Sequence, residues 1–225
     1  MGKNYRKFIY LFSLSLFICS ISTIITAHDD ETLITNVLIV DGTGSEPYSG
    51  SLLIQGDAIA SIFRESSNDL NHHNLVDGMG MVLAPGFLDS HSHFDQGLKE
   101  QPYAKAAITQ GITTIIRGMD GFSGRPDGND TIVYGDHLSV IEFNDLMKDI
   151  PTAFNVASFS SHNSIRSVIM KDDFRREASG IEIKEMSLLV EKDMESGALG
   201  LSTGLEYDPG IYSSTDEVIT LAKVA

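Results

Sequence analysis

The chain has 225 residues, of which 42% are hydrophobic, and its formal net charge is −15 at pH 7. This apolar content excludes an intrinsically disordered chain and is enough for one hydrophobic core or two small ones. The excess of acidic residues argues against binding to nucleic acid or to an anionic membrane surface, because phosphate contacts need clustered Lys and Arg.

The first 27 residues differ in character from the rest of the chain. Residues 1–7 carry three positive charges and no acid, the next twenty are apolar with interspersed Ser and Thr, and the chain turns polar at His28. This order is typical of a secretory signal peptide that ends near Ala27, and it predicts an exported protein. The apolar run is also long enough for an uncleaved membrane anchor, which is the alternative. Cleavage would remove Cys19, the only cysteine, and with it any disulfide or thiol catalysis.

Residues 28–80 have the pattern of a small β domain. Three segments there are rich in β-branched or apolar residues and are predicted strands: 33–40, 51–55 and 58–63. Gly56 and Asp57 separate the last two strands and form a glycine-first turn signal, which predicts a β-hairpin. The polar run around His72 and His73 predicts a surface loop.

From residue 81 onward, segments typical of strands alternate with segments typical of helices. The predicted strands are 81–89, 112–118, 152–161 and 198–204. The predicted helices are 104–111, 138–150, 183–197 and 214–225. This alternation is typical of parallel βα units and predicts an α/β fold. The first strand is a nearly continuous apolar run, so we expect it to be buried on both faces.

Four βα units make half of a TIM-type barrel. A closed barrel needs eight strands and about 250 residues. We therefore expect residues 81–225 to form the amino-terminal half of a (β/α) barrel that belongs to a longer protein. The alternative is a smaller open parallel sheet.

The segment "LAPGFLDSHSHFD", residues 83–95, places two histidines one residue apart after the first predicted parallel strand. Alternation along an extended chain points His91 and His93 to the same side, so that both imidazoles can reach one cation. The carboxyl ends of barrel strands are also where active sites assemble. The alternative is a pair of histidines satisfied by backbone hydrogen bonds.

Four segments together resemble a known family of hydrolases. They are "NVLIVDGTGSEPYSGSLLIQGDAIASI", "LAPGFLDSHSHFD", "QGITTIIRGMDGFS" and "GALGLSTGLEYDPGIYSSTDEVITLAKVA". The chain resembles the N-acyl-D-amino-acid deacylases (D-aminoacylases) of the amidohydrolase superfamily from about residue 36 to residue 225. The resemblance implies a small β-sandwich beside a barrel that holds one or two zinc ions. It also implies a small-molecule substrate, an N-acyl-D-amino acid, whose amide bond is hydrolysed to a free D-amino acid and a carboxylate.

The resemblance also implies a set of metal ligands. The family's His-x-His pair matches His91 and His93, and its next ligand is a cysteine in a G-x-C-G turn. Here the matching turn is "GMDG", which places Asp120 at the position of the thiolate. Asp120 is either a harder oxygen ligand that replaces the thiolate or an ordinary turn residue. The family's remaining metal histidines and its catalytic aspartate come from later strands. We therefore assign no general base, and expect the 225 residues alone to be inactive.

Three further residues are candidates for contacts with the substrate. His162 matches a histidine of the family and is expected to hydrogen-bond near the substrate, with loop capping as the alternative. Tyr207 follows the fourth predicted strand and is expected either to hydrogen-bond the substrate or to pack. Arg166 is expected to form a surface salt bridge, although a guanidinium also suits a substrate carboxylate. The role of Arg117 is open.

Other functions stay open at this point. The front half of the fold is shared widely, so another amidohydrolase, such as a cyclic-amide or dipeptide hydrolase, fits the same segments. A truncated, inactive product or a binding protein that keeps the fold is an alternative from a different class.

Overall fold

The computed structural model describes residues 31–65, 74–95, 97–124 and 138–225. The predicted signal segment 1–27 lies outside these ranges, as do His72, His73 and His137. Within the described ranges, no helix is both long enough and apolar enough to cross a membrane. The chain divides into two compact units, Met1–Pro85 and Gly86–Ala225.

The first unit contains one mixed β-sheet. Its strands are β1 (Glu31–Ile39), β2 (Tyr48–Gln55), β3 (Ala58–Phe63), β4 (Asn74–Asp77) and β5 (Val82–Leu83). The order is β3-β2-β1-β4, and β5 also pairs with β1. The predicted hairpin is confirmed, because β2 and β3 are antiparallel, Gln55 pairs with Ala58, and Gly56 takes a positive φ of 60°.

Burial along β1 follows the pleat of the strand. Leu33, Thr35, Val37 and Ile39 are buried, whereas Asn36 and Leu38 between them are exposed. A period of two residues is what a strand with one covered face requires. The core of this unit therefore lies against one face of the sheet.

The structure divides the apolar run 81–89 between the two units, so the prediction of one doubly buried strand is wrong. Val82 and Leu83 pair with Leu38 and Ile39 of β1, whereas β6 (Phe87–Asp89) begins the second unit. Pro85 between them has no N–H to donate to a ladder, which favours the break. Phe87 and Leu88 are 62% and 58% exposed, and β6 is the edge strand of its sheet.

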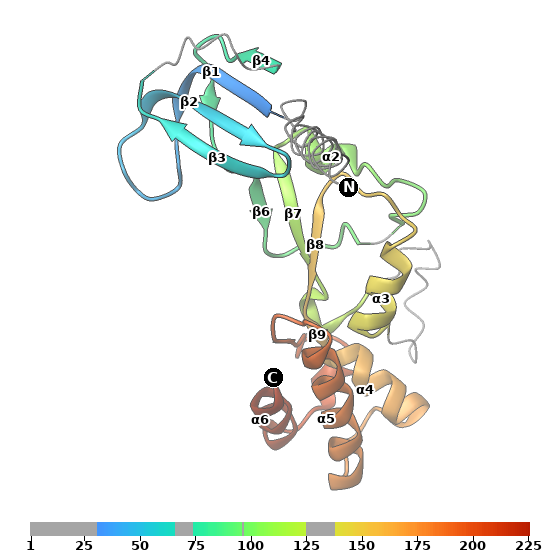
Figure 1. Ribbon diagram of the computed structural model, residues 1–225. Coiled ribbons are helices and arrows are strands. Elements are labelled where there is room, and N and C mark those ends of the chain that lie inside the picture. Colours follow the sequence, from blue (N-terminus) through green and yellow to red (C-terminus); the bar gives the residue numbers. More distant parts are fainter. Residues whose placement is uncertain (1–30, 66–73, 96, 125–137) are drawn as a thin grey trace, which may run out of the picture. The chain divides into compact units, whose positions relative to one another are not determined.

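The second unit has the predicted alternation of parallel strands and helices (Figure 1). Its strands are β6, β7 (Ile112–Arg117), β8 (Asn155–Ser158), β9 (Ser160–Ser161) and β10 (Leu201–Ser202). Its helices are α2 (Lys105–Ile108), α3 (Val140–Met147), α4 (His162–Met170), α5 (Gly180–Glu195) and α6 (Thr215–Val224), with short 3-10 turns η1 (Met119–Gly121), η2 (Lys171–Asp173) and η3 (Gly210–Tyr212). Two parallel sheets result, with the orders β6-β7-β8 and β10-β9. The predicted third strand is thus split into β8 and β9, and the predicted fourth strand, β10, pairs with its second part.

Helix α4 was not predicted from the sequence. Ser, Asn and β-branched residues, which have low helix propensity, make up most of it. Ile165 and Met170 on this helix are buried against α5 and α6, so tertiary packing stabilises a helix that local preference disfavours.

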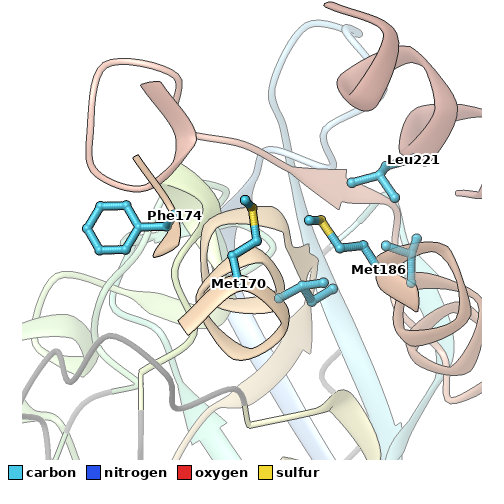
Figure 2. Close-up of a cluster of buried hydrophobic side chains, with 6 residues drawn as sticks. Met170, Phe174, Met186 and Leu221 are labelled. Atoms are coloured by element: carbon cyan, nitrogen blue, oxygen red, sulfur yellow. The ribbon is translucent and has the colours of Figure 1, made fainter. Parts of the chain in front are cut away.

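Two hydrophobic clusters hold the second unit together. One joins α4, α5 and α6 and is shown in Figure 2: Ile165, Met170, Phe174, Met186, Val190 and Leu221. The other packs around strand β7 and helix α3: Leu98, Ile115, Leu138, Phe143 and Phe154. Helices α3 and α5 both begin with a capping box, formed by Ser139 with Glu142 and by Ser179 with Glu182. Ile115 of the second cluster lies on β7, the strand that precedes the candidate site.

Candidate metal centre

His91 and His93 lie on the loop that directly follows β6. The backbone N–H of His91 donates to the Asp89 carboxylate over 3.2 Å, which holds the start of this loop. Ser92 between the histidines is buried, whereas both imidazoles are about half exposed. Their ring centroids are 5.8 Å apart in an edge-on arrangement. The two rings therefore lie on the same side of the chain, as alternation predicts.

Asp120 lies on the turn η1, directly after β7. Its φ of 54° is left-handed, a conformation that Asp adopts more readily than most residues. Gly118 and Gly121 beside it also have positive φ values, 83° and 77°. The N–H of Gly121 donates to the Ser202 hydroxyl over 3.2 Å, so β10 holds this turn in place.

The three predicted ligands converge although they come from two different loops. The Asp120 Oδ2 atom lies 3.2 Å from His91 Nε2 and 3.4 Å from His93 Nε2, and one ligand atom from each residue lies within 4.8 Å of the others. Two ligand atoms bound tetrahedrally at about 2.1 Å from zinc are about 3.4 Å apart. Two imidazoles and one carboxylate also form a ligand set that zinc accepts, so these residues fit the ion.

A buried amide holds the segment that packs against the Asp120 turn. The Asn163 side chain donates to the carbonyl of Gly204 over 2.9 Å and accepts from its N–H over 3.3 Å. A Cβ atom on Gly204 would lie 2.2 Å from the Asp120 carbonyl oxygen, so this approach requires glycine. The segment after β10 therefore packs directly on the turn that carries the candidate ligand.

Tyr207 is on this same segment and is about half exposed. Its ring centroid is 6.4 Å from that of Phe122, two residues after Asp120. The structure therefore brings Tyr207 close to the turn of the candidate ligand, with part of its side chain open to solvent. Its predicted contact with substrate stays a prediction.

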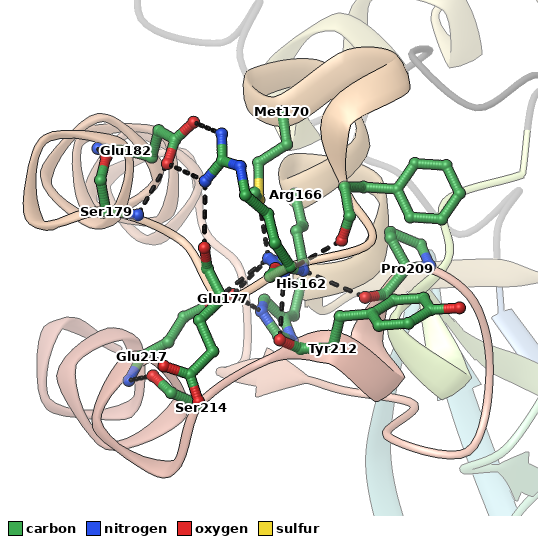
Figure 3. Close-up of polar contacts among 12 residues, drawn as sticks. His162, Arg166, Met170, Glu177, Ser179, Glu182, Pro209, Tyr212, Ser214 and Glu217 are labelled. Carbon is green, nitrogen blue, oxygen red and sulfur yellow. Dashed lines mark hydrogen bonds and ion pairs between the residues drawn. The ribbon is translucent and has the colours of Figure 1, made fainter.

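His162 begins helix α4 and is completely buried. Its Nε2 atom is 2.9 Å from the Glu217 carboxylate (Figure 3). Its Nδ1 atom is 3.2 Å from the Thr203 hydroxyl. Both ring nitrogens thus have partners inside the protein. The structure does not bring His162 into the cluster of His91, His93 and Asp120, and a substrate contact for it stays a prediction.

Arg166 is not on the surface, and the expected surface salt bridge is wrong. Its side chain is fully buried and lies 3.3 Å from the Glu217 carboxylate. The guanidinium also donates to four backbone carbonyls: those of Phe174, Arg176, Pro209 and Tyr212. Burial lowers the pKa of Arg166, and the charge of Glu217 opposes this shift. Arg166 therefore clamps the segment that carries Tyr207 against helix α4.

Arg117 at the end of β7 is also buried and pairs with Asp95. The Nε–Oδ2 distance is 3.1 Å, and the two side chains are 1% and 2% exposed. Burial lowers the pKa of Arg117, whereas Asp95 acts in the opposite direction. Sequence reasoning left this pair unassigned, although Asp95 ends the same segment that contains the two histidines.

Sequence reasoning also missed Glu217 and Asn163. Glu217 occupies the first turn of α6, where an acid is expected for helix stability alone. Asn163 is adjacent to His162, but nothing in the sequence indicates that its side chain is buried against the Gly204 backbone. In both cases the partners are more than 40 residues away in the chain, so no local signal identifies them.

Comparisons with known proteins identify relatives of the chain. The D-aminoacylase of Alcaligenes xylosoxydans xylosoxydans is 32% identical over 203 residues, which are 86% of this chain and 41% of that protein. A crystal structure of D-aminoacylase superposes with a TM-score of 0.77 and 27% identity, over 87% of this chain and 43% of the other. The chain is a relative of the D-aminoacylases. No protein-family model matches it.

A second solved relative bears on the metal. The N-acyl-D-glutamate deacylase of Bordetella bronchiseptica, solved with zinc and a phosphonate mimic of the tetrahedral intermediate, has a TM-score of 0.77 and 29% identity over 87% of this chain. A further D-aminoacylase structure concerns that enzyme's binuclear metal centre. The chain spans about two fifths of the length of the D-aminoacylases and deacylases that it matches.

Proposed function

We propose that these residues contribute a His-His-Asp ligand set to a zinc-dependent amidohydrolase that cleaves N-acyl-D-amino acids. The convergence of His91, His93 and Asp120 carries the proposal, since two loops far apart in sequence present three zinc-type ligand atoms in one place. The relationship to D-aminoacylases supports the substrate class.

The chemistry divides between the ion and the protein. A zinc ion bound here would polarise the acyl carbonyl and lower the pKa of a coordinated water towards neutrality. His91 and His93 would bind as neutral imidazoles, and Asp120 would add one negative charge. Hydrolysis breaks the amide C–N bond, adds water across it, and releases a carboxylate and a D-amino acid.

The protein has a role in orienting the substrate as well. The partly exposed hydroxyl-bearing ring of Tyr207 is near the Asp120 turn and is suited to hydrogen-bond an anionic or carbonyl oxygen of the substrate. We assign no described residue as the general base. We also propose that residues 1–225 alone do not turn over substrate, because the resemblance assigns the proton-transferring aspartate and further histidines to other strands.

Zinc content tests the proposed ligands. We expect His91→Ala/His93→Ala to remove zinc that the wild-type chain retains after dialysis, as measured by elemental analysis. The matched control is His72→Ala/His73→Ala, which removes two neighbouring histidines that the proposal does not involve. Equal zinc in both folded double variants would rule out the His-x-His pair as ligands.

Substrate range tests the reaction. If coding sequence continues beyond Ala225, the extended protein is assayed for release of free amino acid from N-acetyl-D-amino acids, with the L enantiomers as controls. We expect turnover of the D series only. Hydrolysis of hydantoins or dipeptides in preference to N-acetyl-D-amino acids would favour another branch of the amidohydrolases.

A further inference from the structure

A buried ion pair links the two loops that carry the proposed ligands. Asp95 is two residues after His93, and Arg117 is three residues before Asp120. The Arg117 Nε atom donates to Asp95 Oδ2 over 3.1 Å, and both side chains are excluded from solvent. The two loops are thus joined by one short contact close to both ligand positions.

The same two side chains also hold the far end of the Asp120 turn. The backbone N–H of Gly124 donates to Asp95 Oδ2 over 3.1 Å, and the Gly124 carbonyl accepts from Arg117 Nη2 over 3.3 Å. The Asp120 turn is therefore held at both ends, at Arg117 where it follows β7 and at Gly124 where it ends.

Two further contacts fix the guanidinium itself. Arg117 Nη1 donates to the Ser158 hydroxyl at the end of β8 over 3.4 Å. The guanidinium carbon lies 3.8 Å from the ring centroid of Phe143 on helix α3. Arg117 thus uses three nitrogens in three directions and stacks on an aromatic face, which the single ammonium of Lys cannot reproduce.

A contribution to folding stability is a weak explanation for the presence of the buried Asp95–Arg117 pair. Replacing a buried ion pair by apolar residues of similar size is often neutral or stabilising, because two charges must be desolvated to bury it. Partners that orient metal ligands, in contrast, change metal affinity by about 10–100-fold when removed. The location of this pair, between the ligand loops, matches the second role.

We propose that Asp95 and Arg117 are positioning residues that set the distance between the His91–His93 loop and the Asp120 turn. This inference rests on the metal site proposed above. In this arrangement the ligand atoms stand close together before the ion binds, so less reorganisation accompanies binding. Neither residue contacts the ion or the substrate.

The test is zinc affinity, measured by competition with a chromophoric chelator in the full chain. We expect Asp95→Asn and Arg117→Met each to weaken zinc binding about 10-fold or more. Because the two side chains act as one unit, the double variant should lose about as much affinity as either single variant. Arg117→Lys should also weaken zinc binding, since Lys keeps the positive charge but lacks the planar guanidinium with its several N–H donors.

Thermal unfolding of the metal-free protein distinguishes a positioning role in zinc binding from a contribution to folding stability. The double variant removes both buried charges, so we expect it to unfold at a higher temperature than either single variant while its zinc affinity stays low. The control is Arg176→Met/Glu182→Gln, which removes an exposed ion pair that touches neither loop and should leave zinc affinity unchanged. Ser158→Ala removes only one guanidinium contact and can be measured if the single variants do not fold.

The outcomes distinguish the two proposals. Zinc affinity within about twofold of wild type in the folded variants, Ser158→Ala included, would overturn the positioning role and leave the metal site intact. The positioning role would also be overturned if the double variant regained wild-type zinc affinity together with its thermal stability. A wild-type chain that binds no zinc would overturn the metal site itself, and the positioning role with it.

Discussion

The Asp120 carboxylate lies 3.2 Å from the Nε2 atom of His91, although 29 residues separate them in the chain. His91 follows the first strand of a parallel sheet and Asp120 follows its neighbour, so the sheet itself brings them together. The resemblance described above matches Asp120 to the cysteine of the family's G-x-C-G turn, and this match stays a prediction. The contact with His91 favours the interpretation of Asp120 as a ligand over that of an ordinary turn residue.

Substitution of Asp120 should separate these two interpretations. We expect Asp120→Asn to weaken zinc binding at least about 10-fold, because the negative charge is lost while the left-handed turn is kept. Asp120→Cys should keep much of the affinity, since a thiolate is also a zinc ligand. The control is Asp57→Asn, at the exposed hairpin turn of the first unit. Full zinc retention by Asp120→Asn, measured by elemental analysis, would leave Asp120 as a turn residue.

Loss of the Glu217 charge should destabilise the second unit strongly. In Glu217→Gln the buried Arg166 keeps its charge without a carboxylate partner, and we expect a loss of about 3–5 kcal/mol in the free energy of unfolding. The neighbouring change Asp216→Asn is on the exposed side of α6 and should stay within about 0.5 kcal/mol of wild type. Urea unfolding followed by circular dichroism measures both variants. Similar values for the two would show that the buried network contributes little.

Glu182 should make stability depend on acid pH. Its bond to Arg176, together with the Ser179 N–H, lowers the pKa of Glu182 from 4.5 to about 2. A carboxylate whose pKa is lower in the folded state stabilises the fold above pH 4.5, and this contribution is lost as the pH falls towards 2. The stability difference between wild type and Glu182→Gln should therefore be present at pH 6 and shrink progressively below pH 4.5. A difference that is constant from pH 6 to pH 2.5 would contradict this assignment.

Export should remove the first 27 residues. The charged start, the apolar run and the polar break at His28 support the proposal. We expect the mature protein in the exported fraction to begin close to His28, as measured by intact mass. An intact amino terminus in the membrane fraction would favour the anchor instead. A variant with Ala27→Arg, which places a bulky charge at the expected cleavage position, should accumulate uncleaved.

Local patterns determined the parts of the site that depend on a few neighbouring residues. The alternation of an extended chain was enough to place His91 and His93 on one side, and Gly56 with Asp57 was enough to predict the hairpin. The order of βα units also predicted that Asp120 would follow the second parallel strand. These features follow from backbone geometry over short distances, so the sequence carries them directly.

Only the tertiary structure decided which side chains are buried together. Arg166 pairs with Glu217 across 51 residues, and Arg117 meets Asp95 across 22, so neither pair leaves a local periodicity in the sequence. Helix α4 likewise forms because Ile165 and Met170 pack against α5 and α6, against the preferences of its own residues. Such pairs depend on how whole elements pack, because a charge is tolerated in the interior only where another element supplies its partner.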